Sequence, residues 1–183
     1  MQLQYAYLLK QILPLALHHI DETADLELET TMRTTRGANN IDILLKGSSA
    51  AGQVRIGIEL KCYKTIAASG GSRGAHDIFM KDVYEDLQVL EDYIEEGKVS
   101  RGIALVMTDL KQHVLPTVKK GKCWAYDISD GHEYAGGTID VPVGGKPVNV
   151  ELRRMYTFGW RKFGNCWFAN LEGLLPDEKP GAN

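Results

Sequence analysis

A chain of 183 residues with 44% hydrophobic and 25% charged residues is long enough to bury a core, and its composition excludes a wholly disordered protein. A net charge of −3 excludes a uniformly basic nucleic-acid-binding protein. Because the chain has no apolar run of about eighteen residues and no convincing signal-peptide pattern, we expect neither a membrane span nor a secretory leader.

The cysteines indicate a reducing environment. Cys62, Cys123 and Cys166 are odd in number, widely separated and without a Cys-x-x-Cys pair. This pattern predicts neither a disulfide framework nor a zinc site, and it fits a cytoplasmic protein. We expect a single domain over residues 1–183.

The charge is strongly segregated along the chain. Residues 33–73 carry seven Lys/Arg against two acids, which gives +5. Residues 98–122 carry six against one, again +5, and residues 146–168 carry five against one, +4. Residues 74–97 carry eight acids against one lysine, −7. The blocks allow either a basic face with an acidic back or simple solvated charge.

The first elements are a helix and a strand. Apolar residues at helical spacing predict a helix over 2–20, which Pro14 either kinks or restarts. Alternation of apolar and polar residues over 25–35 predicts a first strand, and residues 37–40 are typical of a turn.

Two apolar strands follow, joined by a small polar loop over 46–53. Asp42 opens the first strand. On the second, Arg55, Glu59 and Lys61 share one face. Symmetric closure pairs Leu45 with Val54 and sets Asp42 diagonal to Glu59, whereas a shift of one pair sets Asp42 directly opposite Glu59.

Both registers place the two carboxylates close together on one face. Such a pair repels unless a cation lies between the two groups, and oxygen ligands favour Mg²⁺ or Mn²⁺. With Lys61 beside it, the pair suits activation of a water molecule.

The later elements complete an alternating pattern. A glycine-rich loop over 67–74 leads to an amphipathic helix over 75–97, a strand over 101–108 and a short helix within 110–119. The helix over 75–97 predicts a crossover to a parallel strand. Strands are predicted over 123–128, 138–143, 148–158 and 165–170, and a frayed tail after residue 175.

Asp42 followed by Glu59-Leu60-Lys61, on two paired strands, resembles the active site of the PD-(D/E)XK nuclease superfamily. The residue before Asp42 is Ile41 rather than proline, a departure that many members share. The resemblance implies an α/β fold with a restriction-endonuclease-like core (α-β-β-β-α-β) over about residues 1–120. Its mixed sheet would be flanked by helices, with extra strands over about 121–175.

The resemblance also implies a function. Asp42, Glu59 and the main-chain carbonyl of Leu60 would hold Mg²⁺, with Mn²⁺ as a substitute, and Lys61 would orient the attacking water. The expected activity is a Mg²⁺-dependent DNA endonuclease of restriction, defence or repair type that leaves a 5′-phosphate. The small size suggests a homodimer or a subunit of a larger complex.

Further residues are candidates for supporting roles. Glu22, Glu27 or Glu29 could supply an accessory acid, with Glu22 preferred. Aromatic residues between 153 and 168 are expected mainly in the core. The candidate phosphate contacts are Lys64, Arg73, Arg153, Arg161 and Lys162.

Three alternatives stay open from the sequence. The same fold could be a catalytically inactive nucleic-acid-binding module in which the charged cluster is a structural salt bridge. The acidic stretch 74–97 could instead be a partner surface of an interaction protein. RNA is not excluded as the substrate.

Overall fold

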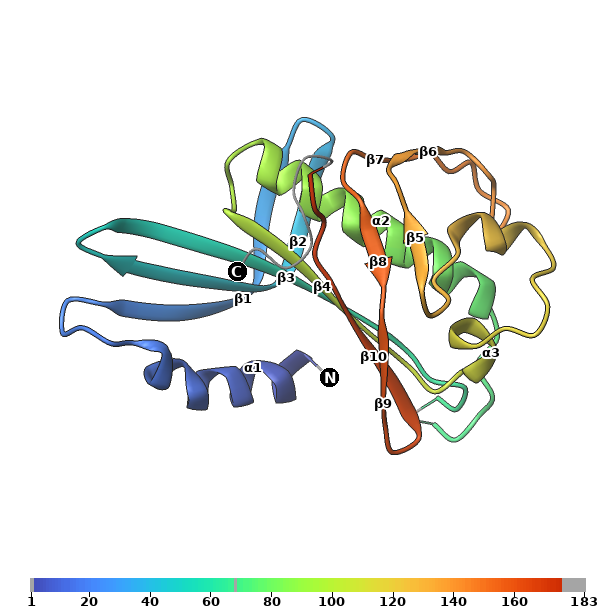
Figure 1. Ribbon diagram of the computed structural model, residues 1–183, viewed down its shortest axis with the longest axis horizontal. Coiled ribbons are helices and arrows are strands. Elements are labelled where there is room, and N and C mark those ends of the chain that lie inside the picture. Colours follow the sequence, from blue (N-terminus) through green and yellow to red (C-terminus); the bar gives the residue numbers. More distant parts are fainter. Residues whose placement is uncertain (1, 68, 176–183) are drawn as a thin grey trace.

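The computed structural model describes residues 2–67 and 69–175, and its centre is a mixed six-stranded sheet of order β1-β2-β3-β4-β10-β9 with helix α2 packed across one face (Figure 1). Two small two-stranded sheets, β5-β8 and β6-β7, are separate from this six-stranded sheet. The elements are α1 (Gln2–Ile12), a 3-10 helix (Leu13–Ala16), β1 (Thr23–Thr34), β2 (Gly37–Ser49), β3 (Gly52–Tyr63), α2 (His76–Glu95), β4 (Arg101–Thr108), α3 (Lys111–Val114), a 3-10 helix (Lys122–Tyr126), β5 (His132–Tyr134), β6 (Gly137–Ile139), β7 (Val150–Leu152), β8 (Tyr156–Phe158), β9 (Trp160–Phe163) and β10 (Cys166–Leu171).

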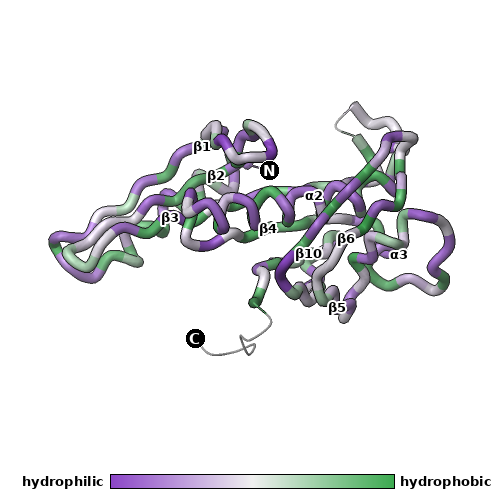
Figure 2. The backbone as a smooth tube through the Cα atoms, turned by 90° about the horizontal axis from the view of Figure 1, so that it is seen from above, coloured by the Kyte–Doolittle hydropathy of each residue, from purple (hydrophilic) through white to green (hydrophobic). Residues whose placement is uncertain are grey.

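The predicted order of the first elements is confirmed. β1, β2 and β3 form an antiparallel meander, and α2 connects β3 to the parallel strand β4. The colour along the β1–β3 ribbon alternates between hydrophilic and hydrophobic residues (Figure 2), as expected for strands with two different faces.

The turns of the meander are tighter than predicted. The β2–β3 connection is only Ala50 and Ala51, because β2 continues to Ser49 and pairs there with Gly52. The predicted loop over 46–53 is therefore wrong, and small polar residues form a projecting ribbon instead (Figure 1). The turn predicted at 37–40 is also wrong, since Gly37 already pairs with Thr34.

Helix α1 is shorter than the predicted helix over 2–20. It ends at Ile12, because Pro14 cannot donate the next helical hydrogen bond and begins a 3-10 turn instead. Ala6 of α1 packs with Ile43 and Ile58, which face away from α2. Leu3, Tyr7 and Ile12 point outward and are exposed.

Helix α2 forms the main core with the other sheet face. Its apolar positions are buried against sheet residues such as Leu44 and Val106. Gly102 makes this approach possible, because a Cβ there would lie 3.0 Å from the Leu90 side chain. Gly57 instead leaves room for Ile41 of the neighbouring strand β2, with which a Cβ would collide. The buried α2 side chains are Phe79, Met80, Val83, Tyr84, Leu87, Leu90, Glu91, Asp92 and Tyr93.

The region after residue 120 departs most from the prediction. Residues 122–126 form a 3-10 helix rather than a strand, because a short apolar run reads alike in both structures. The strand predicted over 148–158 is two strands, β7 and β8, and β5 and β9 were not predicted. The strand over 165–170 is confirmed as β10. The tail after 175 lies outside the described residues.

The acidic residues of α2 neutralise basic residues elsewhere in the chain. Asp92 lies 3.2 Å from Arg36 and 3.5 Å from Arg153, and Asp86 lies 3.0 Å from Lys61. The negative block over 74–97 is thus in part an internal counter-charge for the positive blocks.

His113 should make the fold sensitive to acid. Burial, with a smaller effect of His76, lowers the pKa of His113 from 6.5 to about 4, and its Nδ1 is buried without a hydrogen bond. Between these values the unfolded chain binds the proton and the folded chain does not. The folded state therefore loses about 3 kcal/mol as pH falls from 7 to 4. His113→Phe, which keeps the ring stacked on Phe79, should flatten this part of the urea-unfolding profile. Parallel profiles for both proteins would contradict this.

Candidate active site

Asp42 and Glu59 face each other across β2 and β3. The last ladder pair is Ile43 with Ile58, and one further step of this register sets Asp42 opposite Glu59. Of the two predicted registers, the structure has the shifted one. Both carboxyls lie on the α2 side of the sheet, because Leu44 and Gly57, two positions away on each strand, pack against that core.

The two strands stop pairing through their backbones at this point. Asp42 Oδ2 accepts a hydrogen bond of 2.7 Å from the main-chain N–H of Leu60, so a side chain replaces the ladder bond. On the other side, Glu29 has φ 50°, a rare conformation for a residue with a Cβ, and the β1–β2 pairing skips it. Gln2 donates to both the Asp42 carbonyl (2.9 Å) and Glu29 (2.7 Å). Asp42 is thus held directly by β3 and by Gln2 of α1, and Gln2 links it to Glu29 of β1.

The site carries more negative than positive charge. Burial, followed by the charges of Asp86 and Asp42, raises the pKa of Glu59 to about 9, although Lys61 opposes the rise. A carboxyl that holds its proton at neutral pH marks a position where a nearby cation would be strongly favoured.

Lys61 is held by a residue that sequence reasoning missed. Its Nζ lies 3.0 Å from Oδ2 of Asp86 on α2. Burial would lower the pKa of Lys61, but Asp86, with Asp82 and Glu59, raises it instead. Burial raises the pKa of Asp86 to about 6 despite Lys61. At pH 7 both groups are therefore charged, and Lys61 serves as a fixed cation rather than a base.

The donor set fits a small hard cation. Asp42 and Glu59 offer carboxylate oxygens from adjacent strands, and Mg²⁺ is commonly held by one or two carboxylates with the remaining positions taken by water or phosphate. Within residues 2–67 and 69–175, no group of three or more His, Cys, Asp or Glu side chains could hold a metal ion. The fit therefore rests on the two carboxylates, with the Leu60 carbonyl beside them in β3.

The structure does not bring Glu22 to this site. Thr23 pairs with Ser48, six residues along β2 from Asp42, so Glu22 lies about 20 Å away. Its carboxylate instead accepts from the N–H groups of His18 (2.7 Å) and His19 (3.2 Å), which lower its pKa. Of the other two candidate acids, Glu27 pairs with Lys46, and Glu29 accepts from Gln2.

The predicted phosphate contacts lie in separate places. Lys64 and Arg73 flank the loop after β3 and are exposed near Lys61, with Arg73 over the Tyr63 ring at 5.8 Å. Lys162 pairs with Trp167, which pairs with Thr108, which pairs with Tyr63. Lys162 therefore lies on β9 at the level of Tyr63, three strands away from it. Arg153 belongs elsewhere, at Asp92 of α2.

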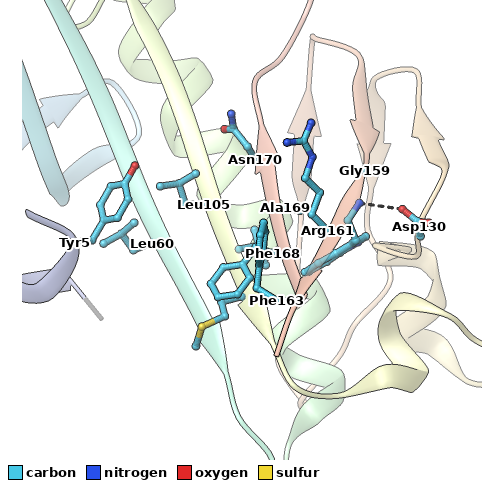
Figure 3. A pocket seen from close by; sticks show the side chains of 13 residues that line it. Tyr5, Leu60, Leu105, Asp130, Gly159, Arg161, Phe163, Phe168, Ala169 and Asn170 are labelled. Carbon is cyan, nitrogen blue, oxygen red and sulfur yellow. Dashed lines mark hydrogen bonds between the residues drawn. The ribbon is translucent and has the colours of Figure 1, made fainter. Parts of the chain in front are cut away.

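A cavity of about 680 Å³ lies on the opposite face of the sheet (Figure 3). Leu60 lines it, although its neighbours Glu59 and Lys61 point to the α2 side. Arg161, a predicted phosphate contact, also lines it. This cavity is therefore distinct from the carboxylate site.

Within the part of the chain that the structure describes, no helix is long and apolar enough to cross a membrane. Comparisons with protein-family models, with curated proteins and with solved structures found no match.

Proposed function

We propose that this chain is a divalent-metal-dependent nuclease that hydrolyses phosphodiester bonds of DNA on a restriction-endonuclease-like core. The observation that carries the proposal is the shifted β2–β3 register, which sets Asp42 opposite Glu59 with Lys61 on the same face. The order of α1, β1–β3, α2 and β4, with β3 parallel to β4, agrees with that core.

Each residue has a role in this proposal. Asp42 and Glu59 would hold Mg²⁺, with the Leu60 carbonyl as a third oxygen. When bound, the ion supplies polarisation of the scissile phosphate and a lower pKa for its water. Lys61, which Asp86 keeps charged and fixed, stabilises negative charge that develops on the phosphate. The N–H of Leu60 keeps one Asp42 oxygen in place.

The charges near the site favour an anionic substrate on one side. Lys64 and Arg73 are exposed beyond the end of β3, within a few residues of Lys61. Lys64 forms no hydrogen bond or ion pair within the described ranges, so it is free to contact a phosphate. A strand that enters from the loop after β3 would therefore meet positive charge before it reaches the carboxylates.

Glu59→Gln should stabilise the metal-free protein. Because the pKa of Glu59 is raised to about 9, the folded state holds a proton that the unfolded chain releases above pH 4.5. The free energy of unfolding therefore falls by up to about 1.4 kcal/mol per pH unit as pH rises from 4.5 towards 9, and glutamine, which does not titrate, removes this loss. In EDTA at pH 8 the variant should have the higher Tm.

Mg²⁺ should reverse this order, since it stabilises only the protein that retains the carboxylate. Glu133→Gln, at an exposed position in β5, is the matched control and should change neither Tm nor its response to Mg²⁺. A lower Tm for Glu59→Gln in EDTA would contradict the raised pKa of Glu59.

The proposal is tested by incubating the protein with supercoiled plasmid in Mg²⁺ or Mn²⁺, with and without EDTA. We expect nicked or linear DNA only when the free cation is present. A folded protein that cleaves neither plasmid nor single-stranded DNA with either cation would overturn the proposed activity.

A further inference from the structure

The cavity on the face of the sheet away from α2 has exposed aromatic rings on its wall. Phe163 is 64% exposed and Phe168 is 38% exposed, and their rings meet edge to face at 5.9 Å between centroids. Tyr5 of α1 lines the other side (Figure 3). Neighbouring aromatic residues such as Phe158 are buried, so these rings are not part of the core.

Two polar side chains of the cavity have no partner in the described part of the chain. The Arg161 guanidinium and the Asn170 amide form neither a hydrogen bond nor an ion pair there, and both residues are exposed. Figure 3 shows their polar ends directed the same way. By contrast, Arg36, Arg101 and Arg154 are each paired with a carboxylate.

The one carboxylate that lines the cavity does not neutralise Arg161. Asp130 accepts a hydrogen bond of 2.9 Å from the main-chain N–H of Trp160, which holds it at the start of β9. The cavity therefore presents an uncompensated positive charge beside apolar rings.

We propose that this cavity binds an unpaired nucleotide of a single-stranded nucleic acid. Its volume of about 680 Å³ is that of a small-molecule site. A base stacks on the more exposed ring, Phe163, beside Phe168, and the Asn170 amide, which both donates and accepts, meets the edge of the base. Arg161 binds the phosphate. The inference does not rest on the carboxylate site, which lies across the sheet.

A second copy of the chain is the main competing occupant, because α1, which supplies Tyr5 to the cavity wall, also exposes Leu3, Tyr7 and Ile12. The polar groups favour the nucleotide. An apolar helix seated in the cavity would cover Arg161 and Asn170 without offering them a partner, and burial of an unpaired charge or amide is costly.

The test is fluorescence anisotropy of a labelled deoxythymidine oligonucleotide, with the full chain in EDTA so that no cleavage occurs. Arg161→Ala and Phe163→Ala should each weaken binding by about five- to a hundredfold, the range for loss of one stacked base or one strong contact. Phe163→Trp should retain binding, because indole offers the same kind of stacking face.

Lys162→Ala is the matched control. It removes one positive charge from the same strand, but Lys162 lies over the Trp167 ring at 5.0 Å, on the alternate side of β9. Its effect should be much smaller than that of Arg161→Ala. Equal effects of the two substitutions would show that binding depends only on general charge attraction, and would overturn the proposal.

Three further arms identify the ligand. A duplex and an abasic strand of the same length should both bind more weakly than the oligonucleotide. Binding that is equal for all three, no binding at all, or equally tight binding of thymidine monophosphate would each overturn an unpaired base of a strand as the ligand. Sedimentation velocity gives the last outcome: a dimer that Phe163→Ala dissociates, with no effect on DNA affinity, would assign the cavity to a second copy.

Discussion

Asp42→Asn is expected to lower the rate of plasmid cleavage by roughly 10²- to 10³-fold, because the lost charge is worth several kcal/mol at a metal-activated phosphate. The fold should survive, since the asparagine oxygen can still accept the hydrogen bond that Leu60 donates to Asp42 Oδ2. Nicking of supercoiled plasmid in Mg²⁺ measures the rate, and the thermal unfolding curve checks the fold.

Asp25→Asn is the matched control for this prediction. Asp25 is exposed on the adjacent strand β1, where it pairs with Lys46. Its replacement by asparagine changes the net charge by the same amount as Asp42→Asn. It should leave the rate nearly unchanged. If Asp42→Asn cleaves as fast as the wild-type protein while Asp25→Asn behaves as expected, Asp42 has no part in the chemistry.

Glu91→Ala is expected to cost about 3–5 kcal/mol of stability. Glu91 is fully buried and accepts hydrogen bonds from three groups: the N–H of Arg153 (2.7 Å), the N–H of Arg154 (3.0 Å) and the Tyr156 hydroxyl (2.9 Å). Alanine would leave these donors buried without partners and detach the chain between β7 and β8 from α2. Urea unfolding at pH 7 measures the loss.

Glu95→Ala, one turn further along the same helix, is the control. Its carboxylate is 47% exposed and lies 3.9 Å from Arg154, so the expected loss is below about 1 kcal/mol. A comparable loss for both variants would show that the buried network around Glu91 does not anchor the C-terminal strands.

The pair Asp42 and Glu59 could be foreseen because it depends on local pattern. Period-two alternation places both carboxylates on one face in any register that buries the apolar residues, so the sequence restricts the choice to two neighbouring registers. The choice between them depends on the turn. Ala50 and Ala51 carry no strong turn signal, and the shift that sets Asp42 opposite Glu59 appears only in the three-dimensional pairing.

Asp86 could not be singled out because α2 offers many acids of similar kind. Asp82, Glu85 and Asp86 lie within five residues of one another, and only the packing of α2 on the sheet brings Asp86 to Lys61. That packing depends on the close approach of α2 that Gly102 permits. Long-range packing of this type leaves no periodic signal in the chain.

The C-terminal strands were difficult to predict for a different reason. β5 through β8 have three residues each, too short for alternation to be distinguished from chance. Their positions depend on polar contacts with distant residues, such as Glu91 with the N–H of Arg153. The exposed rings of Phe163 and Phe168 were likewise expected in the core, because aromatic content does not tell which face of β9 and β10 a helix covers.

Mn²⁺ binding measured by electron paramagnetic resonance tests directly whether Asp42 and Glu59 together hold a divalent cation. The wild-type protein should bind Mn²⁺ in competition with Mg²⁺, and both Asp42→Asn and Glu59→Gln should lose that binding while Asp25→Asn retains it. Undiminished binding in the Asp42 and Glu59 variants, or no binding by the wild-type protein, would show that this pair of carboxylates is not a metal site.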